Sequence, residues 1–153
     1  MNTIKRRFFL KKSLLALGAL SSLALLPKVV FAKWSSDAFS SKKIPDVLKN
    51  LLGSSHTNES TQIKIKAPDI AENGAVVPVT ISTNLAATSI TILAPNNPSP
   101  LIGHFNLSPE AVPYVATRIK MGKTGDIIAV VKVDGMLYTA KKTVKVTIGG
   151  CGG

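Results

Sequence analysis

Short runs of alternating apolar and polar residues between residues 63 and 148 constrain the fold of this chain more than any other feature. Valine, isoleucine and threonine are enriched in these runs, and prolines, glycines and polar clusters separate them. The two longest runs, 126–133 and 136–148, flank Asp134-Gly135, a dipeptide typical of two-residue hairpin turns. About seven such strands separated by turn signals predict an all-β fold, an immunoglobulin-like β-sandwich over residues 63–148. The tryptophan and cysteine marks of antibody domains are missing, so this prediction depends on strand number and alternation.

A short amphipathic helix is expected ahead of the strands. Four apolar residues recur there at helical spacing: Val47, Leu48, Leu51 and Leu52. Pro45 suits the start of such a helix, and Gly53 suits its end. The residues before the helix are polar and serine-rich, which predicts a flexible lead. We assign the lead and the short N-terminal helix together to residues 33–62.

The first 32 residues resemble an export signal of the twin-arginine type. The segment Lys5-Arg6-Arg7-Phe8-Phe9-Leu10-Lys11 carries the paired arginines, although Lys5 stands where serine or threonine is common. The apolar stretch that follows, residues 13–26, is short for a membrane span, which needs about 20 residues. Small residues in Val30-Phe31-Ala32 favour cleavage after Ala32. We therefore expect a periplasmic protein that is free of the membrane once residues 1–32 are removed; an uncleaved membrane anchor is the alternative.

The export route and the charge both bear on the partners of the mature chain. Twin-arginine export carries folded cargo, so a small domain of this kind is expected to travel with a partner already bound. The formal net charge is +11, but residues 1–32 contain six of the 19 basic residues and none of the eight acidic ones. The remaining chain carries +5, a mild basicity that does not require nucleic acid. No basic run interleaved with aromatic residues is present in it, so we predict no nucleic-acid binding.

The sequence closes with Gly149-Gly150-Cys151-Gly152-Gly153, and Cys151 is the only cysteine. A single cysteine cannot form an internal disulfide. The four glycines give the thiol almost nothing to pack against and restrict the backbone little, so residues 149–153 predict a flexible carrier arm. In an oxidising compartment such a thiol is an intermolecular partner or a reactive centre. The alternative is a frayed glycine end with an incidental thiol.

The arm itself contains no histidine, cation or helix terminus that would activate the sulfur. This composition suits a carrier whose thiol is activated inside the active site of another protein. Elsewhere we predict no catalytic residue, no metal site and no cofactor. His56 and His104 lack the spacing of a metal site and are expected to be surface or structural residues. Asp69 and Glu72 fit a solvated turn better than an acid/base pair.

Arg118 and Lys120 are expected on the same face of a strand, because they are two positions apart in an alternating run. They form either an exposed basic face without a further role, a docking surface for an acidic partner, or a group that steadies an anionic sulfur adduct. The sequence does not distinguish these alternatives.

Together these features resemble the SoxY family, the sulfur-carrier subunits of the Sox thiosulfate-oxidation system. The sharpest element of the resemblance is the closing strand with its carrier tail, residues 144–153. Residues 68–79, 97–101 and 117–121 resemble three further segments of the family. Four ordered matches make a chance resemblance improbable.

The resemblance implies a non-catalytic carrier with defined partners. It implies that thiosulfate becomes covalently attached to Cys151 in an oxidative step catalysed by the haem protein SoxXA, and that the manganese hydrolase SoxB then releases sulfate. The remaining sulfane sulfur is oxidised by the sulfane dehydrogenase SoxCD, where present, or passed to storage. SoxZ, another immunoglobulin-like protein, is the implied heterodimer partner. The implied arm residues are Gly149, Gly150, Gly152 and Gly153.

Three other functions stay open at this point. The chain could be a sulfur donor that uses a terminal Gly-Gly thiocarboxylate, although that activation consumes cytoplasmic ATP and leaves Cys151 without a purpose. It could be a structural or adhesion module of the immunoglobulin type. A thiol oxidoreductase is disfavoured because no Cys-x-x-Cys pair is present.

Overall fold

The computed structural model describes residues 35–147 of the chain, and residues 1–34 and 148–153 lie outside that range. The predicted export signal and the predicted carrier arm, Cys151 included, therefore lie outside the described residues. In residues 35–147 no helix has both the length and the apolar character needed to cross a membrane.

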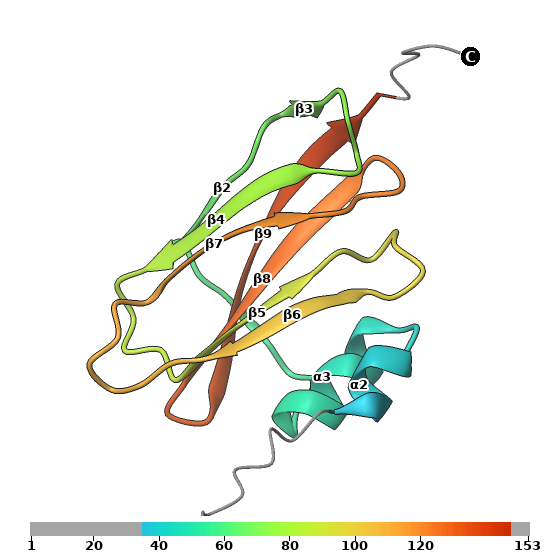
Figure 1. Ribbon diagram of the computed structural model, residues 1–153. Helices are drawn as coiled ribbons and strands as arrows, with labels where there is room; N and C mark the ends of the chain where they lie inside the picture. Colours follow the sequence, from blue (N-terminus) through green and yellow to red (C-terminus); the bar gives the residue numbers. More distant parts are fainter. Residues whose placement is uncertain (1–34, 148–153) are drawn as a thin grey trace, which may run out of the picture. The chain divides into compact units, whose positions relative to one another are not determined.

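Two β-sheets pack face to face, which confirms the prediction of an immunoglobulin-like β-sandwich (Figure 1). The large sheet has the strand order β1-β9-β8-β5-β6, with β3 added to β9, and the small sheet has the order β2-β4-β7. The strands are β1 (Asn58–Glu59), β2 (Ile63–Lys66), β3 (Ile70–Ala71), β4 (Val77–Thr83), β5 (Ser89–Leu93), β6 (Leu101–Asn106), β7 (Tyr114–Ile119), β8 (Gly125–Val133) and β9 (Met136–Val146).

The hairpin between β8 and β9 forms at the predicted dipeptide. Asp134 has a φ of 48° and Gly135 a φ of 81°, so both turn residues lie in the left-handed region that a two-residue turn of this kind requires. Nine cross-strand pairs follow, from Val133 opposite Met136 to Gly125 opposite Val144. The pairing carries β9 along the whole length of the sandwich (Figure 1).

The main core lies between the two sheets and follows from the period-two alternation of the strands. In β4 every second residue is buried, and Val77, Val79 and Ile81 face the large sheet. They meet residues such as Ile92, Ile127, Val131 and Val144, all fully buried in the same cluster. The positions between them carry the polar or small side chains of the outer surface.

Two helices pack against the opposite face of the large sheet, where they bury a second apolar cluster (Figure 1). The predicted helix is α3 (Ile44–Leu52); a proline lies in its first turn, and Gly53 ends it with a φ of 85°. Its buried residues, Val47 and Leu48, join Leu93, Leu101, Val130 and Leu137. Because β5 is covered by the small sheet on one face and by this cluster on the other, all five of its residues are buried.

A second helix, α2 (Ser36–Ser40), occupies part of the segment that we expected to be a flexible lead. Tertiary contacts explain it. Ala38 is fully buried against the second cluster, and the Ser99 hydroxyl donates a hydrogen bond to the Phe39 carbonyl oxygen, 2.8 Å away. The expectation of a flexible lead is therefore wrong for residues 36–40.

Two strands of two residues each, β1 and β3, were not predicted. Both pair in parallel with β9, β1 near its start and β3 at its end. Residues Asn58–Glu59 fall within residues 33–62, which we assigned to the lead and the short helix, and Ile70–Ala71 follow Pro68, the proline after β2. The last two residues of β9, Lys145 and Val146, are thus paired with β3, beyond the point where the pairing with β8 stops.

Candidate functional site

The end of β9 is the place from which the predicted carrier arm leaves the domain. Backbone hydrogen bonds to the segment 69–71 hold this end on one side. The Lys145 amide donates to the Asp69 carbonyl oxygen at 2.9 Å, and the Thr147 amide donates to the Ala71 carbonyl oxygen at 3.1 Å. These bonds continue the parallel pairing of β3 with β9 to the last described residue.

Thr124 holds the same end of β9 on its other side. Its hydroxyl oxygen accepts a hydrogen bond from the Val146 amide at 2.9 Å and donates to the Val146 carbonyl oxygen at 3.3 Å. The regular β8–β9 pairing stops at Gly125 opposite Val144. The Thr124 side chain therefore continues the hydrogen bonding along this side of β9 from Val144 to Val146.

The backbone of Gly74 packs directly against the end of β9, where there is no room for a side chain. Its carbonyl oxygen accepts a hydrogen bond from the Met121 amide at 2.7 Å. A Cβ atom at position 74 would lie 2.8 Å from Cγ1 of Val146 and would also collide with the Met121 carbonyl oxygen. The requirement for glycine here is steric, because a side chain would separate the loop 72–76 from β9 and from residue 121.

Two asparagines tie the loop 94–100 to the residues before β8. The Asn97 amide group donates to the Lys120 carbonyl oxygen at 2.6 Å, and its Oδ1 accepts from the Gly122 amide at 3.1 Å. The Asn96 amide group donates to the Thr124 carbonyl oxygen at 2.8 Å. The loop thereby fixes the backbone of the segment that carries Thr124.

Segments far apart in the sequence thus converge where β9 ends, and we call their contact residues the arm base. The arm base consists of Ala71, Gly74, Asn96, Asn97, Met121, Thr124 and Val146. The segments on which the resemblance was based, residues 68–79, 97–101, 117–121 and 144–153, all contribute to it. The sequence indicated these segments, but it did not predict the contacts between them, and no local signal singled out Thr124.

The predicted site residue itself, Cys151, and the arm residues Gly149, Gly150, Gly152 and Gly153 lie outside the described residues. The structure therefore describes the support of the predicted arm, up to Thr147. A chain that leaves a strand end held by hydrogen bonds on both sides starts from a fixed point, which is what a tether requires.

Asp69 and Glu72, considered as an acid/base pair, are both exposed. Asp69 forms an ion pair with Lys142, with 3.0 Å between Oδ1 and Nζ. The Asp69 side chain is 88% exposed, so this pair contributes little to stability. The pair lies beside the arm base and belongs to a solvated surface, as the sequence indicated.

His104 lies on β6, half-buried, with both ring nitrogens engaged. Nδ1 is 2.9 Å from the Thr91 hydroxyl, and Nε2 is 3.1 Å from Oδ1 of Asn106. Burial lowers the pKa of His104 below 6.5, the Asn106 hydrogen bond opposes this shift, and the charge of Lys132 adds to it. His56, in contrast, is exposed. Across residues 35–147, no group of three or more His, Cys, Asp or Glu side chains is placed to hold a metal ion.

Arg118 and Lys120 lie on the same exposed side of the small sheet, which confirms the predicted alternation. Their neighbours Ile119 and Met121 are buried at 3% exposure each. Arg118 is in β7 and Lys120 follows its last residue, so both precede the Met121 contact with Gly74.

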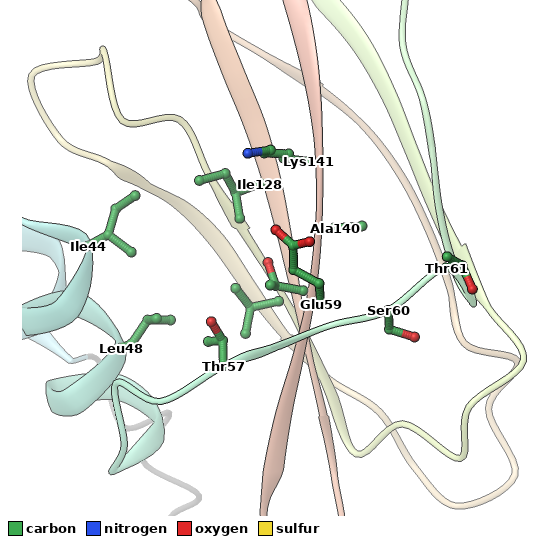
Figure 2. A pocket seen from close by; sticks show the side chains of 11 residues that line it. Ile44, Leu48, Thr57, Glu59, Ser60, Thr61, Ile128, Ala140 and Lys141 are labelled. Carbon is green, nitrogen blue, oxygen red and sulfur yellow. The ribbon is translucent and has the colours of Figure 1, made fainter.

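A pocket of about 450 Å³ lies between α3, the segment 57–61 and the large sheet (Figure 2). Ile44 and Leu48 line it from the helix, and Ile128, Val130 and Ala140 from the sheet. Glu59 and Lys141 add charged side chains. The sequence did not predict this pocket, since it forms only when the helix packs across strands that follow it by 80 residues or so.

Comparisons with known proteins agree with this arrangement. The sequence profile of a family described as "Sulfur oxidation protein SoxY" matches residues 48–151. The solved structure of the sulfur carrier protein SoxY from Chlorobium limicola f thiosulfatophilum is 47% identical, with a TM-score of 0.62, and the match covers 67% of this chain and 94% of that chain. A superoxide reductase (neelaredoxin) from Ignicoccus hospitalis, 22% identical, has a TM-score of 0.51 over 56% of this chain and 80% of that chain, a similarity of fold alone. No curated protein matches the sequence.

Proposed function

Because the chain belongs to the SoxY family of sulfur oxidation proteins, we propose that it carries sulfur intermediates bound covalently to Cys151 and presents them to partner enzymes. Its SoxY relative from Chlorobium is described as a sulfur carrier protein. The chain is accordingly a carrier and not a catalytic enzyme.

The arrangement of the arm base is the observation that carries the proposal. The last described residue, Thr147, is held by the Ala71 carbonyl oxygen, and Val146 is held by Thr124. Cys151 follows Thr147 by four residues. Four residues span at most about 14 Å when fully extended, so the backbone of Cys151 lies no farther than this from Thr147. A partner enzyme therefore has to dock close to the arm base to receive it.

Cys151 takes part in two chemical steps, and atoms and charge are conserved in each. In the first step the thiolate and thiosulfate, S2O3(2−), form a new S–S bond and release two electrons, which a haem protein of the SoxXA type accepts. The product is Cys151–S–S–SO3(−). In the second step water attacks the terminal sulfur, the S–SO3 bond breaks, and sulfate and two protons leave while a persulfide, Cys151–S–S(−), stays on the chain. A hydrolase of the SoxB type performs this step.

The remaining partners and the location are part of the same proposal. A protein of the SoxZ type forms the heterodimer, and a sulfane dehydrogenase of the SoxCD type oxidises the persulfide where it is present. The paired arginines at Arg6 and Arg7 support export by the twin-arginine route to the periplasm. An oxidising compartment suits a carrier whose thiol is loaded by oxidation.

Two substitutions test the proposal against the alternatives. A Cys151→Ser variant lacks the attachment atom, and we expect it to abolish thiosulfate oxidation in a reconstituted system. Full activity of this variant would contradict the proposal and would favour a structural or adhesion module. Truncation after Cys151 removes Gly152 and Gly153; a thiocarboxylate donor would lose all activity, whereas a cysteine carrier still accepts sulfur.

A further inference from the structure

The outer face of the small sheet carries four cationic side chains. Pairing of the strands fixes their positions. Lys64 in β2 lies in one row with Ser82 and Tyr114, and Lys66 lies in the next row with Thr80 and Ala116. Arg118 in β7 lies opposite Pro78, two residues further along the strand. Lys120 follows at the end of β7. We call Lys64, Lys66, Arg118 and Lys120, together with the residues between them, the basic face.

No carboxylate offsets these charges on the sheet. The sequences of β2, β4 and β7 contain no aspartate or glutamate. Among the described residues, none of the four cations lies within ion-pair distance of an acidic side chain, since the ion pair found there joins Lys142 to Asp69. The four cations are exposed, whereas the alternate residues Val79, Val115 and Ile119 are buried beneath them. The face therefore presents a positive potential to solvent.

The residues at the centre of the basic face have short side chains, two of which carry hydroxyl groups. Between the cations lie Pro78, Thr80, Ser82 and Ala116, and Lys66, Pro68, Pro78 and Thr80 line a shallow open groove there. A permanent interface usually has an apolar centre. A face of short side chains bordered by cations, without a large apolar centre, instead suits an encounter that charge guides and that dissociates readily. Tyr114, with 55% of its surface exposed, supplies one aromatic contact of the type enriched in interfaces.

The basic face is continuous with the arm base. At the end of β7, Ile119 pairs with Val77, and the next buried residue, Met121, donates its amide hydrogen to the Gly74 carbonyl oxygen. Gly74 in turn lies against Val146. Arg118 and Lys120 are therefore at the end of the face nearest to Thr147, from which Cys151 extends by at most about 14 Å.

We infer that the basic face is the docking surface for the acidic surface around the active site of a partner enzyme that acts on Cys151. This inference rests on the proposed function and adds to it the side of the carrier on which an enzyme binds. The permanent partner subunit is thereby assigned to another surface.

The test compares two variants with equal change of charge. Lys64→Glu with Lys66→Glu alters the basic face at positions away from the arm base, and Lys43→Glu with Lys49→Glu alters two exposed lysines at the α3 helix. Each carrier, in complex with its partner subunit, is loaded with tetrathionate. The Cys151 thiolate attacks an inner sulfur of S4O6(2−), thiosulfate leaves, and Cys151–S–S–SO3(−) remains. Release of sulfate by a hydrolase of the SoxB type is then measured at low and at raised ionic strength.

We expect the basic-face variant to lower kcat/KM tenfold or more at low ionic strength, with little change in kcat, and the difference to shrink as salt screens the charges. The helix variant should change kcat/KM by less than about twofold. Equal loss in both variants, or unchanged kcat/KM in the first, would overturn the inference. The variant Lys64→Gln with Lys66→Gln removes the two charges without reversing them and should give an intermediate loss of kcat/KM. A graded loss of this kind would show that the effect of the glutamate variant does not come from a folding defect.

Two further readouts separate the possible outcomes. If the basic face held the anionic adduct instead of an enzyme, the substitutions would change the rate at which dithiothreitol reduces the adduct in the carrier alone, and this result would contradict docking. If the wild-type adduct released no sulfate at all, the proposed function itself would fail, and the inference with it.

Discussion

Gly74 lies directly beneath Val146, with room between them for hydrogen but not for a methyl group. A Cβ atom at position 74 would be 2.8 Å from Cγ1 of Val146. Overpacking of this kind typically costs about 1–3 kcal/mol. We expect Gly74→Ala to lower the free energy of unfolding by that amount, measured by urea denaturation.

A neighbouring glycine provides the control for this prediction. At Gly122 a Cβ atom would meet Oδ1 of Asn97 only at 4.0 Å, an ordinary contact. Gly122→Ala should therefore change the free energy of unfolding by about 0.5 kcal/mol or less. Equal stability of the Gly74→Ala and Gly122→Ala variants would contradict the close approach of the loop 72–76 to β9.

Thr124 is expected to protect the end of β9. Replacement by valine removes the hydroxyl that accepts from the Val146 amide at 2.9 Å, at a cost of about 1 kcal/mol. Hydrogen exchange of the Val146 amide should become severalfold faster in Thr124→Val. Thr124→Ser keeps the hydroxyl and should exchange at nearly the wild-type rate; unchanged exchange in the valine variant would show that this bond does not hold the strand.

His104 should make the stability of the domain depend on pH. Burial lowers its pKa in the folded state, whereas the unfolded chain binds a proton near 6.5. The unfolded state therefore binds more protons between these two values, and the free energy of unfolding falls as the pH drops through 6.5 toward the lowered pKa. We expect His104→Gln to reduce this loss, measured by urea denaturation at pH 7.5 and at pH 5.

His56, which is exposed, serves as the comparison for that measurement. The His56→Gln variant should lose stability at low pH as the wild type does. An identical pH dependence of wild type and His104→Gln would mean that His104 titrates alike in the folded and unfolded states.

The features that the sequence predicted are those with local causes. The Asp134-Gly135 turn requires positive φ angles that these residues tolerate, and Pro45 and Gly53 mark a helix because of their own backbone preferences. Alternation revealed strands such as β4 and β7 because each has one face in the core and one face in solvent. These signals sufficed for the fold class and for the position of the last strand.

The features that the sequence did not predict depend on distant contacts. Strand β3 has two residues, too few for a periodic pattern, and exists because Asp69 and Ala71 accept hydrogen bonds from the end of β9. Helix α2 forms in a serine-rich segment because Ala38 is buried in the second cluster and the Phe39 carbonyl oxygen accepts a hydrogen bond from Ser99, 60 positions away. Composition alone singled out Cys151, whereas Gly74 and Thr124 gain their roles only from what they touch.

The length of the arm should limit transfer but not reactivity. Deletion of Gly149 and Gly150 shortens the reach of Cys151 by about 7 Å, half of its span from Thr147. We expect the thiol to react with a small alkylating reagent at the wild-type rate, while sulfate release by a SoxB-type hydrolase falls sharply. A control in which both glycines are replaced by serine keeps the length and should retain most of the transfer. Equal transfer by the shortened arm would contradict the tether.

Intact-mass analysis after loading tests the central claim most directly. The exported protein, in complex with its partner subunit, is incubated with thiosulfate and a haem protein of the SoxXA type, and the peptide that contains Cys151 is then mapped. The account predicts a thiosulfonate group on Cys151 that a reducing agent removes, and a persulfide after treatment with the hydrolase. A Cys151 peptide that stays unmodified while thiosulfate is oxidised would contradict the account.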